Sequence, residues 1–323
     1  MRGRPKKRAA CRRPKALSVL ESSEMSSARV RVRVPATSAN LGSGFDCLGM
    51  ALALTAEVTL EPRDEPLKDP GDPLERLILA AARRAYRAAG RTPPKGLLVC
   101  WEGDIPVARG LGVSAAGRAA GLIAANALCG GPLSLDDLLA IGAHLEGHAD
   151  NMAPALFGGL RVVVQAGEGY LHQQVPLPEE LKVVLFVPDF IMPTEESRQV
   201  LPRQVSREDA VHNIGRAALL IAALSQGRLD LLDAATQDRL HQPARGQIFA
   251  AMDAIMGAAH EAGALAAYLS GGGSTVAALT TEREEDIARA MSDAALARGH
   301  TGRTIVTQPS PEGTIVISEG DAS

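Results

Sequence analysis

Residues 106–116, with the sequence PVARGLGVSAA, carry the residue types that bind phosphate. Gly110 and Gly112 let the backbone turn tightly and approach a ligand closely. The small and apolar residues that follow predict a helix over residues 115–128, and the unpaired N–H groups at a helix start attract anions. Ser114 can cap this helix or contact Mg²⁺. Short glycine motifs also occur in ordinary loops between a strand and a helix, so this segment alone leaves both alternatives open.

Three further segments decide between these alternatives. They are residues 35–49 (PATSANLGSGFDCLG), 146–159 (EGHADNMAPALFGG) and 267–276 (AYLSGGGSTV). In chain order, residues 35–49, 106–116 and 267–276 resemble the three motifs of the GHMP kinases, the small-molecule kinases that include galactokinase, homoserine kinase, mevalonate kinase and phosphomevalonate kinase. Residues 146–159 resemble a further signature, which points to homoserine kinases. The resemblance extends from about residue 29 to about residue 317, and four motifs in family order are not expected by chance.

The resemblance implies an ATP-dependent kinase with Mg²⁺ as its cation. The expected ATP-binding residues are Pro106, Val107, Ala108, Arg109, Gly110, Leu111, Gly112, Val113, Ser114, Ala115 and Ala116. By the same resemblance, Ser114 and Glu146 hold the Mg²⁺ against the phosphates. This hard cation prefers oxygen ligands and keeps several waters, so two protein ligands are sufficient. No Lys-Ser or Lys-Thr pair follows the glycines, which distinguishes the loop from a Walker motif.

The implied acceptor substrate is L-homoserine, an amino acid with a side-chain hydroxyl. A carboxylate is matched by the two-pronged guanidinium of arginine, and an ammonium group by a carboxylate. The expected substrate-binding residues are Asn40, Asp46, Asn151, Thr194, Arg198 and Arg245, with the arginines and Thr194 on the carboxylate and the others at the ammonium and hydroxyl end. Three of these residues, Asn151, Asp46 and Arg198, are also expected to act in catalysis. A lone arginine would be interpreted as a surface charge, so the assignment depends on the pair.

Asn151 occupies the position at which mevalonate kinases carry an aspartate proposed as the base. A neutral amide cannot accept a proton, although it can position a hydroxyl through hydrogen bonds. The neighbouring Asp150 leaves the backbone in a different direction. The expected reaction is therefore transfer of phosphate to homoserine without a dedicated base, giving O-phospho-L-homoserine for threonine biosynthesis.

Two residues depart from the family pattern. Val113 replaces the first serine of the usual Gly-Leu-Gly-Ser-Ser, which removes a hydroxyl, and we expect backbone N–H groups to compensate. Arg118 lies within an otherwise small and apolar predicted helix, and the sequence offers no role for it. Val113 raises the alternative that the chain is a kinase that has lost its activity and serves as a binding module. The presence of Ser114 and Glu146 argues against this alternative.

The composition describes a soluble globular protein of 323 residues, enough for one large domain or two medium ones. Hydrophobic residues make up 46% and aromatic residues only 3%, so the core must consist mainly of alanine, leucine and valine. No apolar run approaches the roughly 20 residues of a membrane helix. The four cysteines show neither disulfide density nor metal spacing, which favours a cytoplasmic location.

The net charge of −3 conceals an asymmetry, because residues 1–28 carry a net charge of +6 and the remainder −9. We expect residues 1–28 to be a disordered basic tail or the product of a start codon placed upstream of Met25. The basic tail also raises the alternative of a nucleic-acid-binding protein. The acidic body and the scarcity of aromatic residues for base stacking argue against that alternative. The expected partner is therefore a small-molecule substrate, and neither a nucleic acid nor a membrane is expected to bind. The sequence leaves open whether the protein forms a homodimer.

The elements that must position these residues mix strands and helices. Strands are predicted at 29–34, 48–60, 97–101, 160–165, 181–187, 264–270 and, as the last strand, 304–308, and residues 316–317 are expected to end the structured part. Helices are predicted at 74–89, 115–128, 135–145, 211–224, 229–238, 247–262 and 282–298. This order predicts an α+β fold. The resemblance implies an N-terminal half like a domain of ribosomal protein S5 and a C-terminal α+β half, with the site between them. The predicted boundaries are 29–187 and 188–317, followed by a short tail at 318–323.

Overall fold

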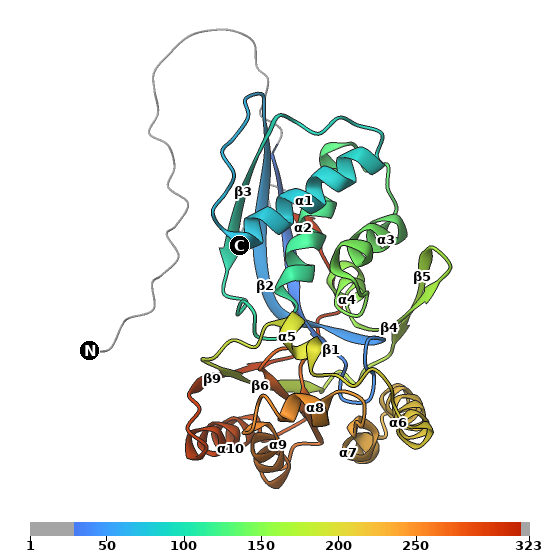
Figure 1. The fold of residues 1–323 in the computed structure, drawn as a ribbon, viewed down its shortest axis with the longest axis vertical. Helices are drawn as coiled ribbons and strands as arrows, with labels where there is room; N and C mark the ends of the chain where they lie inside the picture. The colour runs from blue at the N-terminus through green and yellow to red at the C-terminus, as the bar shows by residue number, and fades with distance from the viewer. Residues whose placement is uncertain (1–28, 318–323) are drawn as a thin grey trace, which may run out of the picture.

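The structure, a computed structural model, describes residues 29–317 and folds them around two antiparallel sheets (Figure 1). The first sheet has the strand order β10-β1-β2-β4-β5, with β3 paired to β2, and the second has the order β7-β8-β6-β9. The strands are β1 (Val30–Ala39), β2 (Leu48–Arg63), β3 (Gly96–Gly103), β4 (Leu160–Ala166), β5 (Gly169–Val175), β6 (Lys182–Pro188), β7 (Ala266–Leu269), β8 (Val276–Thr280), β9 (Gly302–Thr307) and β10 (Ile315–Ile317). With the helices below, they confirm the predicted α+β class. The tails expected at 1–28 and 318–323 lie outside the described residues.

Helices of the first half pack together beside the first sheet (Figure 1). They are α1 (Pro73–Ala88), α2 (Val113–Leu128), α3 (Leu135–Glu146) and α4 (Met152–Phe157). Helix α3 begins with a capping box, in which the Ser134 hydroxyl accepts from the backbone N–H of Asp137 and the Asp137 carboxylate accepts from the backbone N–H of Ser134. This cap fixes where α3 begins, and therefore where its last residue, Glu146, reaches the site.

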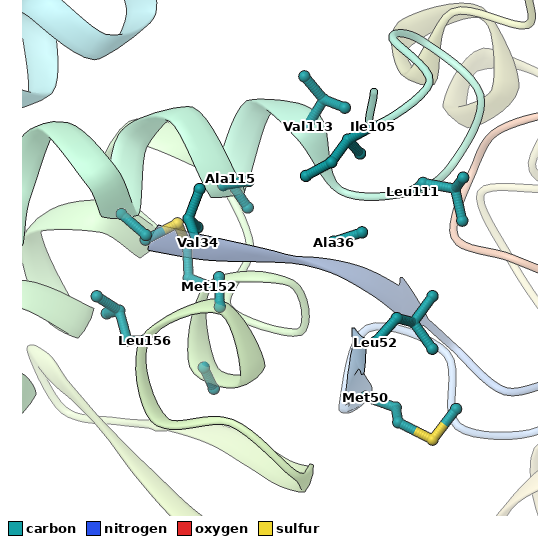
Figure 2. Packing of buried hydrophobic residues seen from close by; sticks show 14 of the residues in the cluster. Val34, Ala36, Met50, Leu52, Ile105, Leu111, Val113, Ala115, Met152 and Leu156 are labelled. Atoms are coloured by element: carbon teal, nitrogen blue, oxygen red, sulfur yellow. The ribbon is translucent and has the colours of Figure 1, made fainter. Parts of the chain in front are cut away.

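The core of the first half is built from small and aliphatic side chains, as the composition predicts (Figure 2). Helix α2 buries a series of alanines against β1 and β2, so its backbone can lie close to the sheet. Val113, the first residue of α2, is 7% exposed and belongs to this core. The side chain that replaces the family serine is thus a packing residue, and the hydroxyl it removes would have been buried.

Helices of the second half lie around the second sheet. They are α5 (Thr194–Gln199), α6 (Arg207–Ser225), the 3₁₀ turn η1 (Leu229–Leu231), α7 (Leu232–Thr236), α8 (Gln242–Gly246), α9 (Met252–Glu261) and α10 (Glu284–Ala297). Helix α9 packs on β7 and β8, and α10 packs on β6 and β9. A second hydrophobic cluster, centred on Phe186, Phe249 and Leu269, lies between these helices and the sheet.

Two strands, β6 and β10, belong to a different sheet from the one that the predicted boundaries imply. Pro188 suggested a boundary because it ends an apolar run, but that run is β6, which pairs with β8 and β9 in the second sheet. The last strand, β10, returns to the first sheet and pairs with β1. Residues 182–307 thus form the second half of the structure, and residues on both sides of that segment form the first. The division into two domains itself stays a prediction.

Several short elements were not predicted, namely α4, α5, α8, β5, β8 and β10. Helices of five or six residues are too short for a hydrophobic period to appear. Strand β5 lies at the edge of its sheet and is mostly polar, whereas β8 is rich in alanine. The helix predicted over 247–262 begins only at Met252, because the chain turns at Phe249 to bury that ring.

Candidate active site

The phosphate-type loop connects β3 to the start of α2. Its backbone is left-handed at Ala108 (φ 55°), Gly110 (φ 78°) and Gly112 (φ 63°). Gly112 is the residue preceding the helix, and no side chain caps this end of α2. The first N–H groups of α2 therefore point into the pocket described below without a side-chain acceptor, as an anion site requires.

The other two kinase-motif segments, residues 35–49 and 267–276, meet at this loop. The Ser270 hydroxyl donates to the carbonyl of Gly110 (2.7 Å), and the N–H of Thr275 donates to the carbonyl of Arg109 (3.0 Å). The N–H of Thr37 in β1 donates to the carbonyl of Leu111 (3.2 Å). Segments that are far apart in the sequence thus form hydrogen bonds with the loop and fix its backbone conformation.

A pocket of about 230 Å³ opens beside the loop. Its walls include Asn40, residues 107–114, Glu146, His148, Asp150, Asn151, Arg198, Arg245 and Gly271, with Leu74 and Leu77 of α1 at one side. The walls therefore combine backbone N–H groups, three arginines, two carboxylates and an apolar face. The described residues that line the pocket do not include Pro106, Ala115, Ala116 or Asp46, which the sequence predicted for the site. The two alanines are fully buried in the core.

Ser114 and Glu146 lie together, as expected for a shared cation. The Ser114 hydroxyl donates to Oε1 of Glu146, across the gap between α2 and the end of α3. Arg118, one turn after Ser114, forms an ion pair with Oε2 of the same carboxylate. The hydroxyl and carboxylate oxygens fit Mg²⁺, which takes oxygen ligands and completes its shell with water and phosphate.

Asn151 belongs to a chain of hydrogen bonds that runs from Thr37 through Asn151 and Asp150 to His148. Its Oδ1 accepts from the Thr37 hydroxyl (2.7 Å), and its backbone N–H donates to Oδ1 of Asp150 (2.9 Å). Nδ1 of His148 lies 2.5 Å from the same Asp150 oxygen. Burial alone would lower the pKa of His148, but the hydrogen bond to Asp150 and the charges of Asp150 and Glu146 raise it on balance. The buried Asp150 carboxylate is thus committed to two protein donors.

Asp46 and Arg198 face each other from opposite halves of the structure. Nη2 of Arg198 donates to one Asp46 oxygen (2.7 Å) and Nη1 to the other (3.0 Å), a bidentate pair. This hydrogen bond raises the pKa of Arg198, and the Asp46 charge adds to the effect. The amide of Asn40 holds the same loop, because it accepts from the N–H of Asp46 and donates to the carbonyl of Gly271.

Arg245 is the largest fully buried side chain of the described residues and is 1% exposed. Its Nη1 donates to Nδ1 of His241 (2.8 Å) and to the carbonyl of Gly271 (3.0 Å), and its Nε donates to the carbonyl of Ser197 (3.3 Å). Burial and the nearby charge of Arg198 lower the pKa of Arg245 to about 10, so it stays protonated at neutral pH. Arg245 is also one of the residues that line the pocket.

His241 fixes the position of Arg245. Its Nε2 lies 2.8 Å from the carbonyl of Gly42, which requires an N–H there, and its Nδ1 accepts from Arg245. Both nitrogens are thus used by the neutral ring. Phe45 stacks on His241 at 5.2 Å between ring centres and lies under the guanidinium groups of Arg198 (5.8 Å) and Arg245 (5.5 Å).

The neutral state of His241 makes stability depend on pH. Burial lowers the pKa of His241 from its ordinary 6.5 to about 4, so between these values the unfolded chain binds a proton that the folded chain does not. The free energy of unfolding should therefore fall by on the order of 3 kcal/mol as the pH falls from about 6.5 to about 4. Urea unfolding at several pH values measures this. The His241→Gln variant should lose this part of the slope, and equal slopes in both proteins would contradict the assignment.

The predicted site residues are thus largely brought together. Asn40, Ser114, Glu146, Asn151, Arg198 and Arg245 line one pocket, and Asp46 pairs with Arg198 at its edge. Thr194 is the first residue of α5, and its side chain is outside what the structure describes. The sequence did not assign Thr37, Phe45 or Arg118 to the site. Of these, only Arg118 carried a signal, a charge inside an apolar helix.

Two further observations concern residues 29–317. Within this range, no group of three or more His, Cys, Asp or Glu side chains is arranged to hold a metal ion. None of the helices formed by these residues has the length and apolar character needed to span a membrane.

Comparison with known families and proteins gives a consistent result. The model of the GHMP kinases N terminal domain matches residues 76–159, and that of the GHMP kinases C terminal domain matches residues 220–297. A homoserine kinase of Moorella thermoacetica is 42% identical over 294 residues, covering 88% of this chain and 99% of its own length. A homoserine kinase of Thermus thermophilus is 44% identical over 283 residues, covering 85% and 94%.

Solved structures agree with these relatives. The homoserine kinase of Cytophaga hutchinsonii superposes with a TM-score of 0.82 at 29% identity, over 93% of this chain and 100% of that one. The mevalonate kinase of L. major, solved with R-mevalonate, has a TM-score of 0.61 at 16% identity, over 86% and 95%. At that identity the second likeness concerns the fold alone.

Proposed function

The chain belongs to the GHMP kinase family, and from this premise we propose that it is an ATP-dependent homoserine kinase that makes O-phospho-L-homoserine for threonine biosynthesis. The observation that carries the proposal is one pocket lined by a phosphate-type loop, Asn151, Arg198 and Arg245, with Asp46 paired to Arg198 at its edge. The loop suits the nucleotide phosphates, whereas the paired charges suit an acceptor that is itself a zwitterion. Relatives named homoserine kinase, more than 40% identical over most of the chain, support the same substrate.

The paired charges provide a place for an amino acid. An incoming carboxylate can replace Asp46 on the guanidinium of Arg198, and the ammonium group can replace Arg198 on Asp46. Arg245, held by His241 and the Gly271 carbonyl, adds a second guanidinium group to the pocket. Each charged group of the substrate thus replaces a partner already present, so no group of the site is left unpaired.

In the proposed transfer, the homoserine hydroxyl oxygen forms a bond to the γ-phosphorus while the bond from that phosphorus to the β-phosphate oxygen breaks. The start of α2 stabilises the negative charge on the phosphates, and the amide of Asn151 positions the hydroxyl. The hydroxyl proton leaves with the transferred phosphoryl group or to water, because Asp150 is held by His148 and by the N–H of Asn151. When bound by Ser114 and Glu146, Mg²⁺ would neutralise phosphate charge.

The absence of a dedicated base can be tested at Asn151. Asn151→Asp places a second carboxylate beside Asp150, whose Oδ1 lies 3.4 Å from Nδ2 of Asn151, and removes the amide donor. We expect kcat to fall by about tenfold and the pH profile to gain no new acidic limb. Asn151→Ala is the control for loss of the side chain. A higher kcat with a new acidic limb in Asn151→Asp would show that a base is useful here.

The substrate is tested by measuring ADP release from the purified full chain with Mg·ATP and each of four acceptors: L-homoserine, mevalonate, galactose and L-threonine. We expect turnover with L-homoserine and none above background with the others, with O-phospho-L-homoserine identified by mass spectrometry. Turnover with mevalonate or galactose instead would favour another kinase of the family. Nucleotide binding without turnover of any acceptor would favour a binding module.

A further inference from the structure

Arg118 is a partly buried charge that the reaction described above does not use. It lies in α2 four residues after Ser114, so the two side chains lie on the same side of the helix. The remainder of α2 is small and apolar, and most of its residues are fully buried. The Arg118 side chain is 15% exposed and the Glu146 side chain is 8% exposed. A charge in this position needs a partner, and Glu146 is that partner.

The two oxygens of Glu146 are both occupied. Oε1 accepts from the Ser114 hydroxyl and Oε2 from the Arg118 guanidinium. Ser114 and Glu146 line the pocket, whereas Arg118 is not among the described residues that do. Arg118 therefore influences the pocket through its ion pair with Glu146.

The charge of this cluster decides how strongly a cation is attracted. Ser114, Glu146 and Arg118 together have no net charge, although a carboxylate alone would carry −1. The pocket walls hold the cations Arg109, Arg198 and Arg245 against two carboxylates. A divalent cation approaching the empty pocket therefore meets little attraction, since like charges in a partly buried site repel over several ångströms. The triphosphate of a nucleotide reverses this balance.

Building on the proposed function, we propose that Arg118 is a positioning residue that holds and neutralises Glu146, so that a divalent cation binds here together with the nucleotide phosphates and not to the protein alone. The ion pair keeps the Glu146 carboxylate aimed at Ser114 before any ligand arrives. The cation then enters already bound to phosphate oxygens and needs only weak additional ligands.

The test is Mn²⁺ binding to the full chain, followed by the electron paramagnetic resonance signal of the free ion, with and without ADP. The wild type should bind Mn²⁺ weakly without nucleotide, and ADP should tighten binding by about tenfold or more. Arg118→Met leaves Glu146 unpaired and should bind Mn²⁺ at least about tenfold more tightly without nucleotide, so that ADP adds less. Arg118→Lys keeps the charge and should restore the wild-type behaviour.

Two controls identify the site of the effect. In Arg118→Met/Glu146→Gln the gain should disappear, because the carboxylate that attracts the cation is gone. Arg239→Met breaks another Arg–Glu pair, with Glu208, far along the chain and should leave Mn²⁺ binding unchanged. Thermal unfolding verifies that each variant is folded. If Arg118→Met does not fold, Arg118→Gln, which keeps a donor for Glu146 without the charge, is judged by the same criterion.

Three results would overturn the proposal: tight Mn²⁺ binding by the wild type without nucleotide, unchanged binding in the folded neutral variant, or a gain that survives Glu146→Gln. None of these measurements uses an acceptor. Failure of the chain to phosphorylate homoserine would therefore be seen separately, in the ADP-release assay, and would not be confused with failure of the role of Arg118.

Discussion

Replacing Gly112 with alanine should lower kcat/KM for ATP by about 10²–10³-fold. Gly112 is left-handed (φ 63°), and a Cβ there would stand 1.8 Å from the Thr37 hydroxyl oxygen and 2.9 Å from Oδ1 of Asn151. The new methyl group must therefore displace the loop, the start of α2 or the Thr37–Asn151 hydrogen bond, all of which meet at the phosphates. Steady-state kinetics with varied ATP measures the effect.

Matched variants separate the clash from the backbone conformation. Gly130 is also left-handed (φ 88°), but a Cβ there would meet no atom within 4 Å, so Gly130→Ala tests the cost of the conformation alone. It should leave kcat/KM within about threefold of the wild type. Thr37→Ala/Gly112→Ala removes the nearest atom and should recover part of the loss. If Gly112→Ala alone is nearly as active as the wild type, the loop does not bind phosphate in the way proposed.

Replacing Arg198 with methionine should raise KM for L-homoserine by about 100-fold and change KM for ATP by less than about threefold. A 100-fold rise corresponds to about 2.7 kcal/mol, the size expected for losing one charge-assisted contact to the substrate carboxylate, while the apolar chain of methionine keeps part of the packing on Phe45. Asp46 is also left without its partner, which adds to the loss at the substrate end. Initial rates with each substrate varied in turn separate the two constants.

Arg228 provides a control with similar geometry. It forms a bidentate pair with Asp230 at 2.8 and 2.9 Å, fully exposed and away from the pocket. Arg228→Met should leave both KM values unchanged, because an exposed pair contributes little. A rise in KM for ATP equal to that for homoserine in Arg198→Met would place Arg198 on the nucleotide and contradict its assignment to the acceptor.

The long elements of the fold could be predicted from the sequence because their hydrophobic periods are long enough to see. Helix α1, for example, spans Pro73–Ala88, within one residue of the predicted 74–89 at each end. The short helices α5 and α8 could not be predicted, although they carry Arg198 and Arg245. The family motifs located these arginines, whereas local patterns did not.

The geometry of the site depended on contacts that no local pattern records. Arg118 and Glu146 are 28 residues apart, and Arg198 and Asp46 are 152 residues apart. A sequence indicates which charges exist, but the pairing of charges is decided by how helices and sheets pack in three dimensions. The same is true of Thr37, a buried strand residue whose hydroxyl turned out to support Asn151.

The segment from residue 182 to residue 307 leaves the first half of the structure and returns to it at one place. Its two ends are side by side, because Val183 pairs with Thr307 across β6 and β9. Residues 177–179 and 308–311, which lead in and out, line a common hollow. The two covalent connections between the halves are therefore adjacent, and elsewhere the halves are held together by non-covalent contacts such as the Arg198–Asp46 pair.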